Sequence, residues 1–347
     1  MRRQPLEQRA GGGGEGFAEI LHAQIVARRS CSKPSHPAST YSIMGESPGR
    51  TCPLSYRYPP GAFDGAPAVR AETLWIAGGL YGNRCALQAL LEAYDAEPGA
   101  KALVFNGDFH WFDAEPGEFE LIDETVRGFH ALRGNVETEI AAPAANAGCG
   151  CAYPEWVGDA TVAHSNAIIE RLRQAAIASG RELQWLSALP MTLVAEVGGE
   201  RIGIVHGDAG SLAGWNFSHE VLGTPQGAAA AERALVRSGV KVFASSHTCL
   251  PVLKTFPGSR AVINNGAAGM PNFRGERCGI ATRISVRPPV DALYGTRCGR
   301  LFVDAMALRY DPAAWEKRFL DLWPARSDAH RSYFARIRQG PDFERAA

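Results

Sequence analysis

Apolar and polar residues alternate with two different periods from residue 73 onward. Short apolar runs are typical of strands, and stretches with an apolar residue every three or four positions are typical of amphipathic helices. The strands predicted in this way are residues 73–77, 101–105, 191–197, 201–206, 240–244, 252–256, 261–263, 280–286 and 301–305. The predicted helices are residues 84–94, 118–130, 160–179, 228–238 and 312–339.

The order of these elements predicts the fold class. Strands and helices alternate in the first half and consecutive strands follow, which favours a layered α/β fold with a mixed sheet or two sheets. A glycine run at residues 11–14, scattered prolines and weak periodicity set the N-terminal part apart. We therefore expect residues 1–70 to form a disordered or extended tail, with Met44 as an alternative translation start. Residues 71–310 then form the main domain, and residues 311–347 form a helical extension.

The composition argues against several classes of protein. Among 347 residues, Lys plus Arg and Asp plus Glu each total 36, so the formal net charge is zero. This balance argues against a nucleic-acid coat or a polybasic membrane binder. No run of about 18 uncharged apolar residues occurs, which argues against a membrane span. Eight cysteines are too dilute for a disulfide scaffold, so we expect reduced thiols and a cytoplasmic protein, with homo-oligomer formation left open.

Polar residues collect at the ends of four apolar stretches. These residues are Asp108, Asn135, His206 and His247, and a glycine directly precedes the first two. In open α/β sheets, the carboxyl ends of the strands form the ligand-binding crevice. Two imidazoles, a carboxylate and an amide oxygen suit a divalent metal such as manganese, iron, zinc or nickel. The set carries one negative charge, so a bound divalent ion stays positive and attracts a phosphate ester.

At these positions the chain resembles the calcineurin-like metallophosphoesterase superfamily. The motifs of that family are Asp-x-His, Gly-Asp, Gly-Asn, a single His and Gly-His-x-His, each after a strand. Gly107-Asp108, Gly134-Asn135, His206 and His247 match them, and residues 263–271 resemble the closing segment of the family. The compact bacterial branch is the most similar, with an Asp where this chain has Glu137.

The resemblance implies a fold, a cofactor and an activity. The family fold is a four-layer α/β/β/α sandwich with two mixed β-sheets flanked by helices, so residues 71–310 would form a metallophosphoesterase-like domain. The implied activity is metal-dependent hydrolysis of a phosphate mono- or diester by a metal-bound water. The expected partner is a small phosphorylated substrate, with no membrane and no strong nucleic-acid signal. Two alternatives stay open: a mononuclear metalloenzyme of a redox class, and a non-catalytic ligand-binding protein with the same fold.

The chain departs from the family at the first of its two metals. Gly79 and Tyr81 stand where the family has the Asp and His of its first motif, and Cys249 replaces its last His. By the resemblance, every residue that would bind only the first metal is changed, whereas the four strand-end residues that hold the second metal remain. The losses therefore fall on a single site.

Two interpretations of this departure follow. In the favoured one, the chain binds one divalent metal, and Tyr81 or His110 acts catalytically in place of the lost ion. In the other, Tyr81 phenolate and Cys249 thiolate hold a first metal, and thiolate would favour zinc or iron. The favoured interpretation predicts one metal per chain.

Three more residues are candidates for catalysis or substrate binding. His110 would lie beside Asp108 if both are on one strand, since alternate residues share a face. Packing of His110 in a loop is the alternative. Asn83 and Arg133 are candidate substrate-binding residues, the arginine because its guanidinium donates in a fork. Arg133 at the surface is the alternative.

Two loops are predicted near the mouth of the site. Cys149 and Cys151 are spaced too closely for a structural zinc pair, and we expect both to be reduced thiols. Tyr153 and Trp156 follow them and are predicted to line the mouth of the cleft. Trp215 belongs to a further loop that is predicted to lie over the site.

Overall fold

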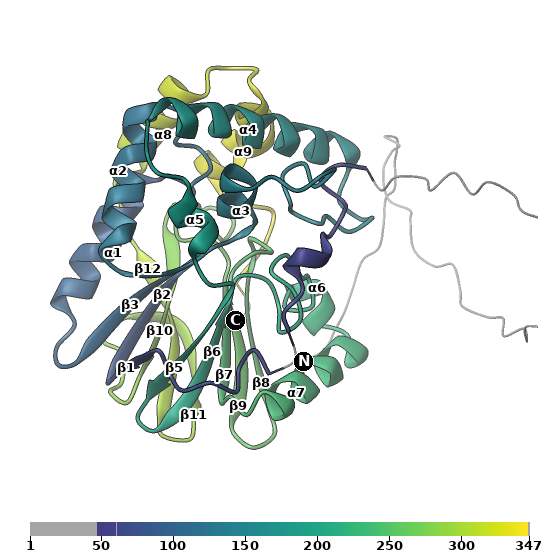
Figure 1. Cartoon of the computed structure of the whole chain (residues 1–347). Coiled ribbons are helices and arrows are strands. Elements are labelled where there is room, and N and C mark those ends of the chain that lie inside the picture. The colour runs from purple at the N-terminus through teal and green to yellow at the C-terminus, as the bar shows by residue number, and fades with distance from the viewer. Residues whose placement is uncertain (1–46, 60, 346–347) are drawn as a thin grey trace, which may run out of the picture. The chain divides into compact units, whose positions relative to one another are not determined.

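The computed structural model describes residues 47–59 and 61–345 (Figure 1). The part of the expected tail up to residue 46, with the alternative start at Met44, lies outside the described residues. The described strands are β1 (Val69–Ala71), β2 (Thr73–Ala77), β3 (Lys101–Asn106), β4 (His130–Leu132), β5 (Thr192–Val197), β6 (Glu200–Val205), β7 (Val242–Ser245), β8 (Pro251–Phe256), β9 (Arg260–Asn265), β10 (Gly279–Ser285), β11 (Ala292–Cys298) and β12 (Leu301–Leu308). The described helices are η1 (Leu54–Tyr56), α1 (Arg84–Ala96), α2 (Pro116–Arg127), α3 (Asn135–Ala141), α4 (Asp159–Ala178), α5 (Gln184–Ala188), α6 (His219–Leu222), α7 (Pro225–Arg237), α8 (Pro312–Leu322) and α9 (Asp328–Gln339).

These strands form two mixed six-stranded sheets. One sheet has the order β11-β12-β10-β2-β3-β4, and the other has the order β1-β5-β6-β7-β9-β8. Strands β2, β3 and β4 are parallel, and so are β6, β7 and β9. The carboxyl ends of three neighbouring strands therefore lie together at one end of each sheet. The predicted strands 191–197 and 201–206 form an antiparallel hairpin as β5 and β6, and Gly198 and Gly199 at its turn both have positive φ.

An apolar layer lies between the two sheets. Side chains alternate along a strand, so Leu74 and Ile76 of β2 face the opposite sheet while Trp75 faces the helices. Ile202 and Ile204 of β6 fill the same layer from the other side. Helices α1 and α2 cover the outer face of the first sheet, and α7 covers that of the second (Figure 1). The expected four-layer α/β/β/α sandwich is confirmed.

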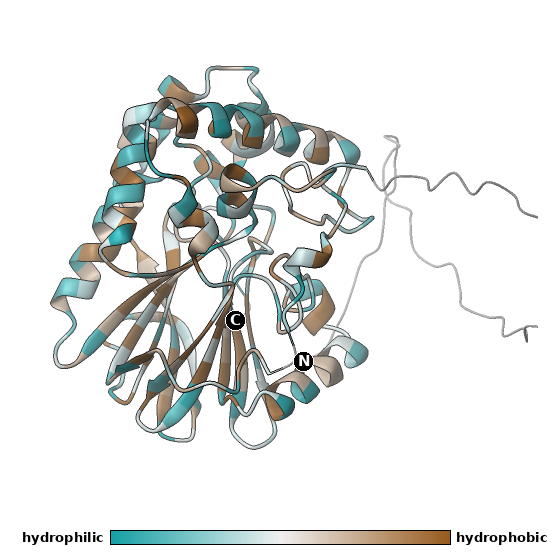
Figure 2. Ribbon diagram, viewed as in Figure 1, coloured by the Kyte–Doolittle hydropathy of each residue, from teal (hydrophilic) through white to brown (hydrophobic). Residues whose placement is uncertain are grey.

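The helices follow the predicted apolar period. In α1, Ala86, Leu87 and Leu90 are buried. Leu90 follows Ala86 by four positions and Leu87 by three, so the three side chains share one face of the helix. Figure 2 shows hydrophobic residues gathered along the strands and hydrophilic residues on the outward sides of the helices. The burial of these apolar stripes fixes the helices on the sheets, and the sheets in turn position the strand ends.

Three element predictions require correction. The helix expected over 118–130 ends at Arg127, because His130 already begins β4 and pairs with β3. The apolar pattern does not predict β11, since this edge strand is mostly half-exposed and lacks an apolar run. The single helix expected over 312–339 is two helices, α8 and α9, and Pro324 lies between them.

Residues 47–70 do not form the tail that was expected for residues 1–70. The Tyr56 side chain is buried, and its hydroxyl donates to Glu139 Oε1 at 2.6 Å. The rings of Phe63 and Phe243 pack with their centroids 5.1 Å apart. Strand β1 extends the second sheet beside β5. The apolar residues of this stretch are few and stand among prolines and glycines, so no periodic signal identifies it.

The C-terminal helices pack on the same domain. Helix α9 lies against α4, and its Arg336 donates to the carbonyls of Pro271 and Cys249 at 2.9 and 2.7 Å. These contacts tie the predicted helical extension to the loop that contains Cys249. No helix within the described residues is both long and apolar enough to cross a membrane.

Candidate metal centre

Four strand ends bring the predicted ligands together. Asp108 follows β3, Asn135 follows β4 and begins α3, His206 follows β6, and His247 follows β7. All four side chains are buried, and the most exposed of them, Asp108, is 5% exposed. Two come from each sheet, so the site lies where the carboxyl ends of the two sheets meet.

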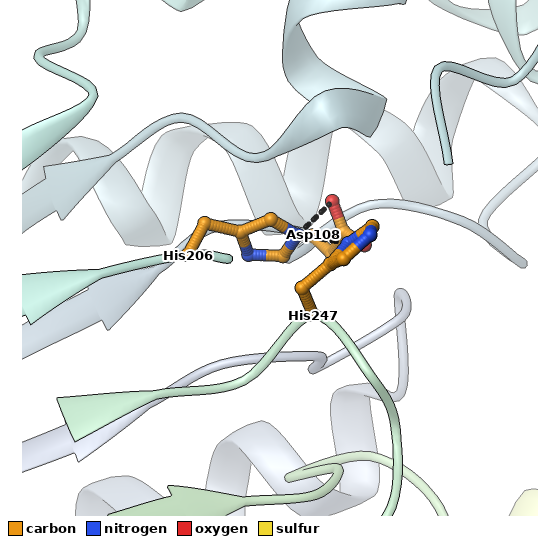
Figure 3. A group of neighbouring side chains, drawn as sticks. All are labelled: Asp108, His206 and His247. Carbon is orange, nitrogen blue, oxygen red and sulfur yellow. Dashed lines mark hydrogen bonds and ion pairs between the residues drawn. The ribbon is translucent and has the colours of Figure 1, made fainter. Parts of the chain in front are cut away.

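The carboxylate and the two imidazoles form a compact group. One ligand atom each from Asp108, His206 and His247 lies within 4.8 Å of the other two. His206 Nε2 is 3.3 Å from Asp108 Oδ1 and 3.2 Å from His247 Nδ1. Figure 3 shows the three side chains pointing toward one another from separate strand ends. Asn135 joins them, with its Oδ1 3.1 Å from His206 Nε2.

Backbone carbonyls orient the two rings of this group. His206 Nδ1 lies 2.9 Å from the Asn106 carbonyl, and His247 Nε2 lies 3.0 Å from the Cys151 carbonyl. A carbonyl only accepts, so each of these ring nitrogens carries the proton. The other nitrogen of each ring faces the centre, and in the neutral form of the ring it carries no proton, which is the arrangement a metal ligand needs.

The loop with Cys149 and Cys151 completes this orientation. Its carbonyls accept from Asn135 Nδ2 at 2.9 Å and from His247, so the Asn135 oxygen is turned toward the centre. Both cysteines are free and buried, and burial raises the pKa of the Cys151 thiol well above its ordinary value. The backbone of this loop therefore contributes to the site. All seven cysteines in the described part of the chain are free.

Burial and neighbouring charges shift the pKa values of the two histidines in opposite directions. Burial and the adjacent His206 lower the pKa of His247 to about 3, against a smaller opposing effect of Asp108. Burial also lowers the pKa of His206, but Asp108 and the Asn106 carbonyl outweigh it and raise the pKa overall. His247 is therefore neutral near pH 7, whereas His206 holds its proton to a higher pH than a free histidine.

This difference predicts that metal binding releases a proton. A metal ligand must be unprotonated, so an ion that binds at or below the raised pKa of His206 displaces its proton. We expect proton release that approaches one proton per ion as the pH falls below the pKa of His206, with a fall in affinity of up to ~10-fold per pH unit in that range. Calorimetric titration in two buffers with different ionisation enthalpies measures this number. Binding that releases no proton at pH 6.5 would contradict the assignment of His206.

Glu137 holds the turn that presents Asp108. Its carboxylate accepts the backbone N–H groups of Asp108, Phe109 and Gly134 at 2.8, 3.0 and 2.8 Å. Asp108 has φ 51°, a left-handed conformation that is costly for a residue other than glycine, and these bonds stabilise it. From the sequence, no role was predicted for Glu137 beyond its place in a motif. Its spacing of three residues from Gly134, typical of a capping box, was the available signal.

Tyr81 occupies the space beside Gly79. A β-carbon at position 79 would lie 2.9 Å from both Cε2 and Cζ of the Tyr81 ring, so no carboxylate fits there. The Tyr81 hydroxyl and the Cys249 thiol share a hydrogen bond at 2.9 Å. The three residues that depart from the family pattern are therefore neighbours, and the tyrosine ring covers the glycine.

Both Tyr81 and Cys249 are neutral in this environment. Burial, followed by the neighbouring Cys249 and Asp108, raises the pKa of Tyr81 well above its ordinary value. Burial also raises the pKa of Cys249, and the Arg336 guanidinium offsets only part of that effect. Among the described residues, no cysteine belongs to the group of side chains placed to share a metal ion.

His110 lies away from the metal group. Its ring is fully buried and stacks on Phe119 of α2 with centroids 4.0 Å apart, and its Nδ1 is 2.5 Å from Asp113 Oδ2. The expected shared face with Asp108 requires a continuing strand. Strand β3 instead ends at Asn106, and the positive φ of Asp108 turns the chain. The loop-packing alternative for His110 therefore describes the structure.

The candidate substrate-binding residues are engaged elsewhere. Asn83 caps α1: its Oδ1 accepts the N–H groups of Cys85 and Ala86 at 3.0 Å, and its Nδ2 donates to Gly269. Arg133 donates through Nη1 to the carbonyl of Ser187 in α5. Neither side chain lines the cavity beside the metal group.

A narrow cavity opens beside the metal group. Asp108, Asn135 and His247 line it, and so do Tyr81 and Cys249. The predicted mouth residues Tyr153 and Trp215 line it as well. The sequence missed Trp111 and Tyr333, which also line it; Tyr333 comes from α9, far along the chain.

Comparisons with known proteins give structural neighbours only. No protein-family model and no curated protein matches the sequence. A hypothetical protein from Pyrococcus horikoshii OT3 shares 18% identity and a TM-score of 0.55, over 78% of this chain and 99% of that chain. A metallophosphoesterase from Sphaerobacter thermophilus shares 17% identity over 78% and 100%, with a TM-score of 0.49. A novel archaeal phosphodiesterase shares 13% identity over 61% and 92%, with a TM-score of 0.31.

The likeness to the Pyrococcus protein shows a common fold. At this identity the likeness concerns the fold alone.

Proposed function

We propose that the chain hydrolyses a phosphate ester at a single divalent metal held by Asp108, Asn135, His206 and His247. The observation that carries this proposal is the convergence of these side chains from four strand ends, with Asp108, Asn135 and His247 also lining one cavity. The motifs shared with the calcineurin-like family support the same class of reaction.

The donor set fits a divalent transition metal. Imidazole nitrogens favour zinc, iron and nickel, and the carboxylate and amide oxygens also accept manganese. Each ligand atom faces the centre because a hydrogen bond fixes the far side of the imidazole or amide that carries it. A bound divalent ion would polarise a phosphoryl oxygen and lower the pKa of water.

The residues beside the centre support one metal rather than two. The Tyr81 ring leaves no room for a carboxylate at position 79, and the Tyr81 and Cys249 groups are neutral and bonded to each other. A neutral Tyr81 hydroxyl can instead donate a hydrogen bond to a phosphoryl oxygen or to the leaving oxygen. Tyr81 thus takes a binding role where the family places a metal ligand.

A redox metalloenzyme is the second candidate. Two histidines and one carboxylate are also the ligand type of mononuclear iron oxygenases, and Asp108, His206 and His247 form such a group. In this case the Tyr81–Cys249 pair would lie beside an iron ion. This alternative predicts oxygen consumption and no ester hydrolysis.

Turnover by the metal-loaded protein tests both candidates. The protein is loaded with manganese, iron or zinc and assayed on a phosphate mono- and diester, and the iron form is assayed for oxygen consumption. Ester hydrolysis that the His247→Ala variant lacks supports the proposal. Oxygen consumption without hydrolysis supports the second candidate. If neither activity is found with any metal, a non-catalytic ligand-binding protein is the remaining interpretation.

A further inference from the structure

A second, larger cavity borders the loop that contributes Trp215 to the cavity at the metal group. This outer cavity has a volume of about 660 Å³ and is lined by residues from 58–59, 61–64, 208–210, 216–217 and the second half of α7. None of the four proposed metal ligands lines it. Cavities that bind small molecules usually measure about 300–1,000 Å³, so the outer cavity has the size of a ligand site.

Apolar side chains form much of the lining of the outer cavity. Phe63 and Phe217 line it, and both rings pack on the Phe243 ring, with centroids 5.1 and 5.4 Å away. This packing holds the two lining rings in place. The helix contributes small apolar residues, which leave room for a ligand: Ala230, Ala231 and Ala234. An apolar group of a ligand would be buried favourably here.

Two side chains of opposite charge also line the outer cavity, and neither is paired. Asp64 and Arg237 are exposed, and their side chains make no hydrogen bond or ion pair, with each other or with any other residue that the structure describes. A ligand with a single charge would be attracted by one of these groups and repelled by the other. A ligand that carries both signs gives each group a partner.

The second carboxylate in the lining, Asp208, is already satisfied by the loop around it. Its Oδ1 accepts the backbone N–H groups of Gly210 and Ser211 at 2.8 and 3.0 Å. Its Oδ2 accepts from the backbone and the side-chain nitrogen of Asn216 at 3.1 and 2.6 Å. These four bonds use the Asp208 charge to hold the loop, so Asp64 is the carboxylate that remains for a ligand.

The Tyr58 side chain adds a hydrogen-bond donor that has no acceptor. Tyr58 lines the outer cavity, and its buried hydroxyl has no partner among the described residues. Burial, followed by the nearby Asp208 charge, raises the pKa of Tyr58 well above its ordinary value, so the hydroxyl keeps its proton. A buried donor without an acceptor costs free energy, and an acceptor on a ligand would remove this cost.

We propose that the outer cavity binds a free α-amino acid with an apolar side chain. The ammonium group pairs with Asp64, and the carboxylate pairs with Arg237, whose guanidinium fork matches two carboxylate oxygens. The carboxylate also accepts from the Tyr58 hydroxyl. The apolar side chain of the ligand lies on Phe63 and Phe217. This binding requires no metal, so the site goes beyond the proposed hydrolytic function and does not depend on it.

Calorimetric titration of the full chain with L-leucine and L-phenylalanine tests the proposal. Two analogues of phenylalanine serve as matched probes: 3-phenylpropionate lacks the ammonium group, and phenethylamine lacks the carboxylate. We expect saturable binding of at least one amino acid, and binding of each analogue that is weaker by about tenfold or more. Arg237→Gln and Asp64→Asn should each weaken amino-acid binding about tenfold, and Tyr58→Phe about threefold to tenfold.

Two charge-removing variants outside the outer cavity are the controls. Arg331→Gln on α9 and Asp95→Asn on α1 each replace an exposed charged residue and should leave amino-acid affinity unchanged. Thermal unfolding confirms that each variant is folded, and without ligand Tyr58→Phe should unfold at no lower temperature, because its hydroxyl has no bond to lose. The proposal is overturned if neither amino acid binds at millimolar concentration, or if 3-phenylpropionate binds as tightly as phenylalanine. Unchanged amino-acid affinity in both Arg237→Gln and Asp64→Asn would overturn it as well.

Discussion

Replacing either histidine of the metal group by alanine is expected to abolish metal binding at micromolar concentrations. His206→Ala and His247→Ala each remove one of four ligands from a buried site, and the gap has no substitute donor. Loss of groups that only orient a ligand already costs about 10- to 100-fold in affinity, so loss of a ligand should cost at least ~100-fold. Metal content after gel filtration, measured by inductively coupled plasma mass spectrometry, shows the effect.

Cys249→Ala is the matched comparison. Cys249 is half-buried near the site, but its thiol bonds to Tyr81 and lies outside the group that can share an ion. We expect this variant to keep its metal. If Cys249→Ala lost as much metal as His247→Ala, the thiol would be a ligand and the one-metal arrangement would be wrong.

A single methyl group at position 134 is expected to disrupt the same site. A β-carbon on Gly134 would lie 2.2 Å from Asp108 Oδ1 and 2.7 Å from the Asp108 backbone nitrogen. The backbone nitrogen cannot move freely, because Glu137 holds it. Gly134→Ala should therefore displace the Asp108 carboxylate, lower metal affinity about 10- to 100-fold and destabilise the fold by about 1–3 kcal/mol.

Gly117→Ala in α2 is the control for this substitution. A β-carbon on Gly117 meets no atom within 4 Å, so the added methyl group causes no collision. Both glycines have backbone conformations open to alanine, since neither is among the residues with positive φ. Metal titration and thermal unfolding of the two variants should differ clearly. Equal metal affinity and equal thermal stability of the two variants would show that the close contact between position 134 and Asp108 has no effect on the site.

The sequence predicted the strand ends well because their signal is local. An apolar run followed by glycine and a polar residue marks Asp108 and Asn135, and parallel strands then bring such ends together. The same local reasoning does not hold for His110, because side chains alternate between the two faces of a sheet only while the strand continues. The turn at Asp108 depends on Glu137, which lies 29 residues further along the chain.

The cavity wall could not be predicted in the same way. Tyr333 reaches the site only because α9 packs on α4, and that contact is a tertiary one. Residues 47–70 escaped prediction for a related reason. Their few apolar side chains, such as Tyr56 and Phe63, fill gaps in other elements and follow no period of their own. Long-range packing of isolated side chains leaves little trace in a single sequence.

The number of metal ions bound per chain tests the central claim most directly. The purified protein is equilibrated with excess manganese or zinc, freed of unbound ions and analysed for metal and protein. The arrangement of Asp108, Asn135, His206 and His247, with Tyr81 over Gly79, predicts one ion per chain. Two ions per chain, the second one lost in a Tyr81→Phe or Cys249→Ala variant, would contradict it.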